Sequence, residues 1–289
     1  MNPKERKSLL LLLAALLPSL AFAQTGERKV LDCSVVEVIY QLKEKSAPKE
    51  KEESSTNNYF TILSAGERVA QFQDYALYQK DSVELLSPPA DKESIQKYAS
   101  KYNKSLHYFE PVISQKLEES RLHMTDVIAI DYYNYSEPFP TWELKEDQPI
   151  TIAGYSCKKA VIGYGGKVWH AWYTEDIPLQ YGPWKLCNLP GLILRAESED
   201  GEFAFNAVVI RQVEREILDT NHLRSETTKR DIFVKKKNEI YTGGRILQSI
   251  PTAAISSMTV FELENGERAI IINGARLRNP MGKYLPIEQ

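Results

Sequence analysis

The 289-residue chain has few of the residues from which catalytic and metal sites are built. It contains three cysteines and four histidines, and three cysteines are too few for a small disulfide scaffold. It also has no CxxC or HExxH spacing, no GxSxG and no glycine-rich phosphate loop. These absences leave no motif for a metal centre, a nucleophile elbow or a phosphate cradle. We therefore predict no catalytic residues, no metal site and no cofactor.

The chain also lacks an excess of positive charge and a long apolar run. Its formal net charge is -3 and its isoelectric point is near 5.9, whereas a face that binds nucleic acid is basic. The longest apolar stretch, residues 8–20, is shorter than the roughly 20 residues that a membrane-spanning helix needs. The composition thus argues against a nucleic-acid partner and predicts no transmembrane segment after the first 23 residues.

The N-terminus has the three parts of a secretory signal peptide. Lys4, Arg6 and Lys7 supply a basic start, the apolar run follows, and the small residues of Ala21-Phe22-Ala23 precede Gln24. This order predicts cleavage before Gln24 and export to the periplasm, the outer-membrane surface or the extracellular space. We divide the chain into a signal peptide at 1–23, an antiparallel β domain at 24–218 and a C-terminal extension at 219–289. The extension is expected to contain a helix and a β-hairpin packed on the same domain.

The mature part is dominated by short segments of β-branched and aromatic residues. Gly165-Gly166 and Asp200-Gly201 are strong hairpin turns between such segments, and consecutive hairpins indicate an antiparallel sheet. We predict a mainly β (α+β) protein with a large curved antiparallel sheet or half-barrel and one or two packed helices, over 91–104 and 219–237. The predicted strands cover 33–42, 59–63, 69–72, 112–117, 126–133, 141–144, 157–164, 167–174, 191–198, 203–211, 258–263 and 269–272.

Four stretches of the central region occur in an order that resembles a known family. They are TWEL at 141–144, IAGYSCKKA at 152–160, AWYTEDIPLQYGPWKLCNLPGLIL at 171–194 and GEFAFNAVVI at 201–210. Their order is similar to that of the GLPGLI family, secreted proteins of Gram-negative bacteria. Asn188 stands where the family name has its first glycine, and asparagine tolerates left-handed backbone better than most residues. The resemblance implies secretion and a common architecture, and it implies no reaction.

The motif itself is built to form a rigid corner. Pro183 interrupts regular structure before it, and Pro190 fixes its own φ while restricting Leu189 to extended backbone. Gly191 permits a backbone shape or a close approach that a side chain would prevent. We predict that the corner, which includes Asn188, leads into the hairpin formed by 191–198 and 203–211. Two roles remain open for this corner: it is purely architectural, or it also forms a contact surface for a partner.

The cysteines allow two arrangements. Three thiols enter an oxidising compartment, so at least one of them does not pair within the chain. We predict a Cys157–Cys187 disulfide, which closes a loop of about 30 residues and adds about 3 kcal/mol. The alternative is that both are buried free thiols. Cys33, in the first strand, is expected to be a buried apolar residue.

Aromatic residues crowd the region that carries the motif. Trp169, His170, Trp172, Tyr173 and Trp184 are our candidate ligand-binding residues, because a curved sheet lined by such side chains forms an apolar concavity. The alternative is that these aromatic side chains fill the core and that His170 is a hydrogen-bonded structural residue.

These features favour a non-enzymatic exported protein that binds an apolar small molecule or a protein segment in an aromatic-lined concave sheet. One alternative is an accessory partner, in the cell envelope, of an outer-membrane transport or export system. Another is a hydrolase of unrecognised type, which requires a pocket with His170 or Cys33 beside a carboxylate.

Overall fold

The computed structural model describes residues 29–45, 56–86, 93–94, 96–97, 109–145, 148–219, 225–262, 268–273, 275–277 and 286–289. The predicted signal peptide lies outside these residues, as does most of the predicted helix over 91–104. Within the described ranges, no helix is both long and apolar enough to cross a membrane.

Thirteen strands form one large sheet, with the order β13-β6-β5-β4-β3-β2-β1-β12-β11-β10-β9-β7, and β8 pairs with β9. All pairings in it are antiparallel except β13 with β6. The strands are β1 (Val30–Lys45), β2 (Thr56–Gly66), β3 (Val69–Asp74), β4 (Val112–Lys116), β5 (Arg121–Ile128), β6 (Asp131–Pro138), β7 (Glu143–Leu144), β8 (Ile150–Ile152), β9 (Tyr155–Tyr164), β10 (Lys167–Thr174), β11 (Leu192–Ser198), β12 (Phe203–Leu218) and β13 (Ser225–Thr227).

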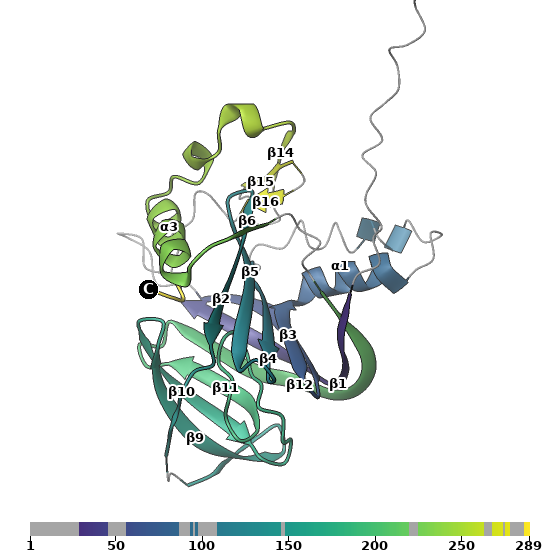
Figure 1. The fold of residues 1–289 in the computed structure, drawn as a ribbon, viewed down its shortest axis with the longest axis vertical. Helices are drawn as coiled ribbons and strands as arrows, with labels where there is room; N and C mark the ends of the chain where they lie inside the picture. Colours follow the sequence, from purple (N-terminus) through teal and green to yellow (C-terminus); the bar gives the residue numbers. More distant parts are fainter. Residues whose placement is uncertain are drawn as a thin grey trace, which may run out of the picture.

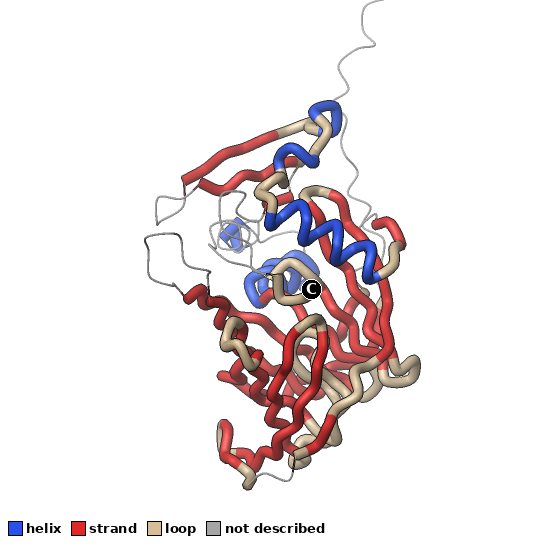
Figure 2. The backbone as a smooth tube through the Cα atoms, turned by 90° about the vertical axis from the view of Figure 1, so that its left-hand side faces the viewer, coloured by secondary structure: helices blue, strands red, loops and turns tan. Residues whose placement is uncertain are grey.

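The other elements pack around this sheet. They are the helices α1 (Tyr75–Leu86) and α3 (Arg230–Thr242), two short 3₁₀ turns at Leu247–Ser249 and Thr252–Ala254, and a second sheet of β14 (Met258–Glu262), β15 (Arg268–Ile272) and β16 (Ala275–Leu277). Figure 1 shows α1 and α3 on separate parts of the main sheet. In this view the second sheet is drawn above the upper ends of β5 and β6. The tube in Figure 2 shows how strongly the main sheet curls.

The two faces of the main sheet are buried by different partners. On β1, Val38 and Tyr40 face the core, and the Tyr40 hydroxyl donates to the carbonyl of Ile193 at 2.6 Å. Glu37, which precedes Val38, lies on the opposite face, where it accepts a hydrogen bond from Tyr78 of α1 at 2.5 Å and pairs with Arg211. Burial, together with Glu37, raises the pKa of Tyr78 to about 12. The helix α1 therefore packs on the outer face of the sheet, where it contacts β2 and β3 and reaches Glu37 of β1.

The predicted fold class is confirmed. The protein is mainly β, with a large antiparallel-dominated sheet that curls without closing, and in the described part of the chain the helices α1 and α3 pack on it. The two hairpin turns are also as predicted, because Gly165, Gly166 and Gly201 all have left-handed backbone, with φ of 63°, 80° and 66°. The predicted C-terminal hairpin is formed by β14 and β15.

Two predicted segments were wrong in their extent. The strand over 126–133 is two strands, β5 and β6, joined by a turn in which Ala129 has φ of 58°. The helix over 219–237 begins later, because β12 continues to Leu218 and α3 starts at Arg230.

The helix α1 was not predicted. Asp74 caps its start by accepting hydrogen bonds from the backbone N–H groups of Ala76 and Leu77, as an N-cap residue does.

Residues 175–191, which connect β10 to β11, form what we call the inserted segment. Its central residues, 181–187, are all buried. Gln115 of β4 holds this part of the chain, because its side-chain amide donates to the carbonyls of Gly182 at 2.7 Å and Trp184 at 2.9 Å. The inserted segment thus covers the concave face of the curled sheet, which the strands alone leave open.

Substituting Gln115→Met tests this attachment. The two carbonyl oxygens would lose their buried donors, at about 1–3 kcal/mol for each unsatisfied group, so we expect about 2–4 kcal/mol of destabilisation in urea unfolding. The matched control is Gln41→Met, at a partly exposed position whose amide contacts Asn58 at 3.4 Å. It is expected to change stability by less than about 0.5 kcal/mol. Equal effects of the two substitutions would contradict the attachment.

Candidate functional site

Three of the five candidate ligand-binding residues are buried inside the molecule. Trp169 is 0 % exposed, Trp184 1 % and Tyr173 2 %. The ring centroids of Trp169 and Trp184 are 5.3 Å apart, and Tyr164 packs edge-on against Trp184 at 5.6 Å. These aromatic side chains fill the concave face by packing against one another.

The other two candidates, His170 and Trp172, lie on the opposite face of β10. Trp172 is flanked by cations, with the guanidinium of Arg195 4.8 Å and the ammonium of Lys159 5.6 Å from its ring centroid. His170 Nε2 lies 3.7 Å from Glu199 Oε1. The alternation of side chains along a strand separates these residues from Trp169 and Tyr173, so the five candidates do not form one site.

The motif corner has the backbone that its residues require. Asn188 has φ of 71° and its side-chain amide donates to the carbonyl of Pro140 at 2.9 Å. A Cβ on Gly191 would lie 2.0 Å from the carbonyl oxygen of Thr174, so only glycine fits there. Pro183 and Leu189 are buried, while Pro190 is exposed. The corner therefore seats the inserted segment against β10 and β11.

The structure corrects the cysteine predictions. The Cys157–Cys187 disulfide is not formed, and all three cysteines are free thiols. The two buried thiols have different surroundings, since Cys157 Sγ contacts the carbonyl of Tyr155 within β9, whereas Cys187 lies in the inserted segment, where its own carbonyl accepts from Trp142. Cys33 is exposed rather than buried, because the strand alternation turns Ser34 inward. Burial raises the pKa of both Cys157 and Cys187, which makes them poor nucleophiles.

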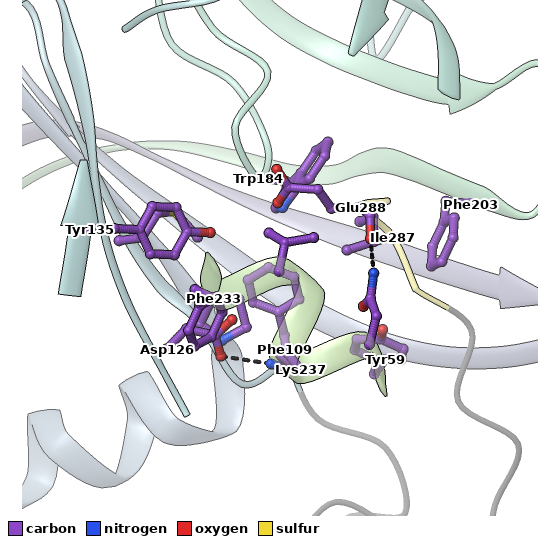
Figure 3. Close-up of a pocket in the computed structure, with 14 residues that line it drawn as sticks. Tyr59, Phe109, Asp126, Tyr135, Trp184, Phe203, Phe233, Lys237, Ile287 and Glu288 are labelled. Atoms are coloured by element: carbon purple, nitrogen blue, oxygen red, sulfur yellow. Dashed lines mark hydrogen bonds and ion pairs between the residues drawn. The ribbon is translucent and has the colours of Figure 1, made fainter. Parts of the chain in front are cut away.

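A small cavity remains beneath the inserted segment. Its volume is about 50 Å³, enough for one or two water molecules and far below the several hundred Å³ of a ligand pocket. Figure 3 shows its walls, to which the sheet, α3 and the inserted segment all contribute. Its lining residues include Tyr59, Phe109, Asp126, Tyr135, Trp184, Phe203, Phe233, Lys237, Ile287 and Glu288.

Four charged residues from four separate segments meet beside this cavity, and we call them the Lys185 cluster. Lys185 of the inserted segment is fully buried, and its ammonium lies 2.6 Å from a carboxylate oxygen of both Glu137 and Glu288. Arg230, at the start of α3, pairs with the other oxygen of each carboxylate, at 3.2 Å for Glu137. The cluster contains two cations and two carboxylates, so its formal charges balance.

Neighbouring residues stabilise the ion pairs of the Lys185 cluster. Lys185 also donates to the hydroxyl of Tyr135 at 3.1 Å, and burial raises the pKa of Tyr135 well above its usual value, as do the nearby carboxylates. Burial alone would lower the pKa of Arg230, but Glu288 and Glu137 raise it. Removing one member of such a buried network leaves an uncompensated charge, which typically costs about 3–5 kcal/mol.

A second buried cluster lies on the other side of the cavity. The ammonium of Lys237 on α3 is 2.7 Å from Glu110 and 2.8 Å from Asp126, and the Tyr241 hydroxyl donates to Glu110 at 3.3 Å. Burial raises the pKa of Asp126, as does the neighbouring Glu110, although Lys237 opposes the shift. This cluster fixes α3 to β5 and so completes the wall of the cavity.

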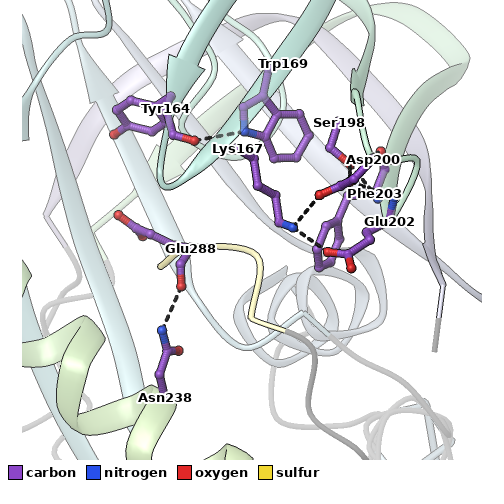
Figure 4. A network of polar contacts seen from close by, with 9 residues as sticks. All are labelled: Tyr164, Lys167, Trp169, Ser198, Asp200, Glu202, Phe203, Asn238 and Glu288. Carbon is purple, nitrogen blue, oxygen red and sulfur yellow. Dashed lines mark hydrogen bonds and ion pairs between the residues drawn. The ribbon is translucent and has the colours of Figure 1, made fainter. Parts of the chain in front are cut away.

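Residues 286–289 close the remaining side of the cavity. Ile287 lines it, and Glu288 belongs to the Lys185 cluster. The main chain is held as well, because the Asn238 side-chain amide donates to the carbonyl of Glu288 and the N–H of Gln289 donates to the carbonyl of Gly165, both at 2.8 Å. Figure 4 shows the first of these bonds and also Lys167 of β10, which pairs with Asp200 and Glu202.

Cys33 lies in a shallow surface hollow at the start of β1. The hollow is lined by Val30, Leu31, Asp32, Cys33, Arg68, Glu214, Arg215 and Glu216. Burial alone would raise the pKa of Asp32, but hydrogen bonds from the backbone N–H groups of Arg68, Val69 and Cys33 hold it below its usual value. No histidine is among these lining residues, and the described part of the chain contains no group of three or more side chains placed to hold a metal ion.

One comparison with known proteins concerns the central region, and the structural comparisons cover most of the chain. Residues 121–236 match the sequence profile of the family described as N-glycanase peptide, N-terminal domain, over less than half of the chain. A solved structure of PNGF-II in space group P21 is similar with a TM-score of 0.48 and 14% identity, over 82% of this chain and 40% of that one. The C2 form gives a TM-score of 0.44 and 15% identity, over 82% and 39%. No curated protein sequence matches significantly, and the chain spans about 40% of the PNGF-II chains.

The sequence analysis missed the Lys185 cluster. A weak signal was present, since Lys185 stands between Trp184 and Leu186 within an otherwise apolar motif, and a buried lysine must be paired. Nothing in the sequence identified the carboxylates that pair with it.

The thiols provide a direct test of the corrected cysteine assignment. In native protein, we expect Ellman's reagent to modify Cys33 and to leave the two buried thiols unreacted. After unfolding without a reductant, all three should react, because none is in a disulfide. A Cys33→Ser variant serves as the control and should show no rapid reaction in the native state. One reactive thiol after non-reducing unfolding of the wild type would instead establish the Cys157–Cys187 bond.

Proposed function

We propose that this protein is a non-enzymatic binding protein that holds a protein segment beside the Lys185 cluster, at the place where residues 286–289 lie. The predicted signal peptide and the GLPGLI resemblance form the sequence-based part of the proposal, which places the protein outside the cytoplasm of a Gram-negative cell.

The observation that carries the proposal is how residues 286–289 are bound. They combine an apolar side chain in the cavity, a carboxylate between two cations, and main-chain bonds to Asn238 and Gly165. Main-chain bonds supply affinity and side-chain pockets supply specificity when a protein binds an extended peptide. These four residues therefore illustrate how the site would hold a segment of a partner.

Elsewhere on the concave face, side chains also donate hydrogen bonds to main-chain carbonyl oxygens. Side-chain donors from Gln115, Trp142 and Tyr40 all bond to main-chain carbonyl oxygens of the inserted segment or of the strand after it. An apolar small molecule would use none of these donors, and the cavity of about 50 Å³ is too small to admit one. The structural details favour a protein segment over an apolar ligand.

A shortened variant that ends at residue 285 tests the proposal. Calorimetry with the synthetic peptide Tyr-Leu-Pro-Ile-Glu-Gln, the sequence of residues 284–289, should show saturable one-to-one binding. The full-length protein should bind the same peptide at least about tenfold more weakly, because its own segment competes at a high effective concentration. Palmitate and 1-anilinonaphthalene-8-sulfonate should give no stoichiometric binding to either protein.

A second variant covers the case in which the shortened protein does not fold. Full-length Ile287→Ala keeps the main chain and the charge but weakens the apolar anchor, so it should bind the peptide more tightly than the wild type. The matched control is Ile232→Ala on the exposed side of α3, where Ile232 is 55% exposed, and its affinity should equal that of the wild type. No saturable peptide binding to a folded shortened protein would contradict the proposal.

A further inference from the structure

We propose that the site selects an acidic residue that follows an apolar one, that Lys185 and Arg230 make this selection, and that Ile287-Glu288 acts as an internal competitor of the ligand. This inference rests on the proposed function and names the chemistry of the segment that the site takes.

The first argument is the charge balance of the Lys185 cluster. With Glu288 in place, Lys185 and Arg230 face two carboxylates. Without the Glu288 carboxylate, the same two cations would face Glu137 alone. Lys185 is fully buried and Arg230 is about two-thirds buried, so water screens the excess positive charge weakly. The vacated site therefore attracts a negatively charged group.

The second argument is the geometry around the Glu288 carboxylate. Lys185 donates to one oxygen and Arg230 lies within ion-pair distance of the other, so each oxygen faces a cation. A glutamine at this position has one oxygen, and its amide nitrogen would point its hydrogens at a cation. A buried donor that faces another donor loses its hydrogen bond and is repelled. The site consequently distinguishes glutamate from glutamine, although the two side chains have nearly the same shape.

The third argument concerns the length of the side chain and its neighbour. The main chain at 288–289 is fixed by Asn238 and Gly165, so the distance from backbone to cations is set by the protein. Aspartate is one methylene shorter, so we expect it to pair less closely with the two cations. Ile287 lines the aromatic-walled cavity beside Trp184 and Phe233, which places the apolar residue immediately before the glutamate.

The experiment is a thermodynamic cycle with two peptides and two proteins. The shortened protein is titrated with Tyr-Leu-Pro-Ile-Glu-Gln and with Tyr-Leu-Pro-Ile-Gln-Gln, and both titrations are repeated on the same protein carrying Arg230→Gln. We expect the glutamate peptide to bind at least about tenfold more tightly to the unsubstituted protein, and this preference to fall to about threefold or less with Arg230→Gln. The matched control is Arg121→Gln, because Arg121 on β5 bonds only Ser136 among the described contacts, and it should keep the full preference.

The outcomes separate this inference from the proposed function. Equal affinity of the two peptides would overturn the selection of an acidic residue, while the binding of a segment would stand. Binding of neither peptide to the folded shortened protein would contradict the proposed function itself.

A measurement on the full-length protein tests the internal competitor without truncation. The substitution Glu288→Gln should increase the affinity for Tyr-Leu-Pro-Ile-Glu-Gln at least about tenfold over the wild type, because it weakens the competing segment. Unchanged affinity in a folded Glu288→Gln protein would overturn the competition.

Discussion

The ammonium of Lys185 is fully buried, so the surrounding segments must supply carboxylates to pair with it. This requirement links the segments that cover the concave face. The lysine comes from the inserted segment, and its partners come from the end of β6 and from residues 286–289, while Arg230 of α3 completes the balance. A buried ion pair of this kind adds little net stability, but an unpaired member is very unfavourable. Each charge of the cluster therefore needs a partner of opposite sign at this place, which favours one defined way of covering the curled sheet.

This arrangement explains why a region so rich in aromatic residues is not an open ligand pocket. Trp184 enters the core with the inserted segment and packs against Trp169 and Tyr164. What remains is a space for one or two water molecules and a place where residues 286–289 bond to the end of the β9–β10 hairpin. Binding of a chain segment follows from the same contacts that hold the fold together.

Much of the sheet was predictable from sequence, and the reasons are local. Gly165-Gly166 and Asp200-Gly201 need left-handed backbone, so they identify their hairpins without tertiary information. The turn at Ala129 carries no such residue, and β5 and β6 were merged for that reason. The helix α1 has a sequence signal in Asp74, but the aromatic residues after it resemble a strand.

The candidate site was less predictable because it combines residues that are distant in the sequence. Alternation along β10 places His170 and Trp169 on opposite faces, whereas only the tertiary structure shows that Trp169 packs against Trp184. The Lys185 cluster joins residues 137, 185, 230 and 288, and no periodicity or spacing connects those positions. The cysteine pairing was wrong for a similar reason, because the proximity of two motifs in sequence does not bring their sulfur atoms together.

Native-state hydrogen exchange measured by mass spectrometry tests the account most directly. The amides of Gly182, Leu186 and Asn188 donate to Gln115, Pro183 and Gln180 within the covered face. If the inserted segment is part of the core, these amides open only in the unfolding that also exposes β10 and β11, with the same free energy. Exchange of these amides within seconds, while β10 and β11 stay protected, would show that the segment is a surface loop and would contradict the account.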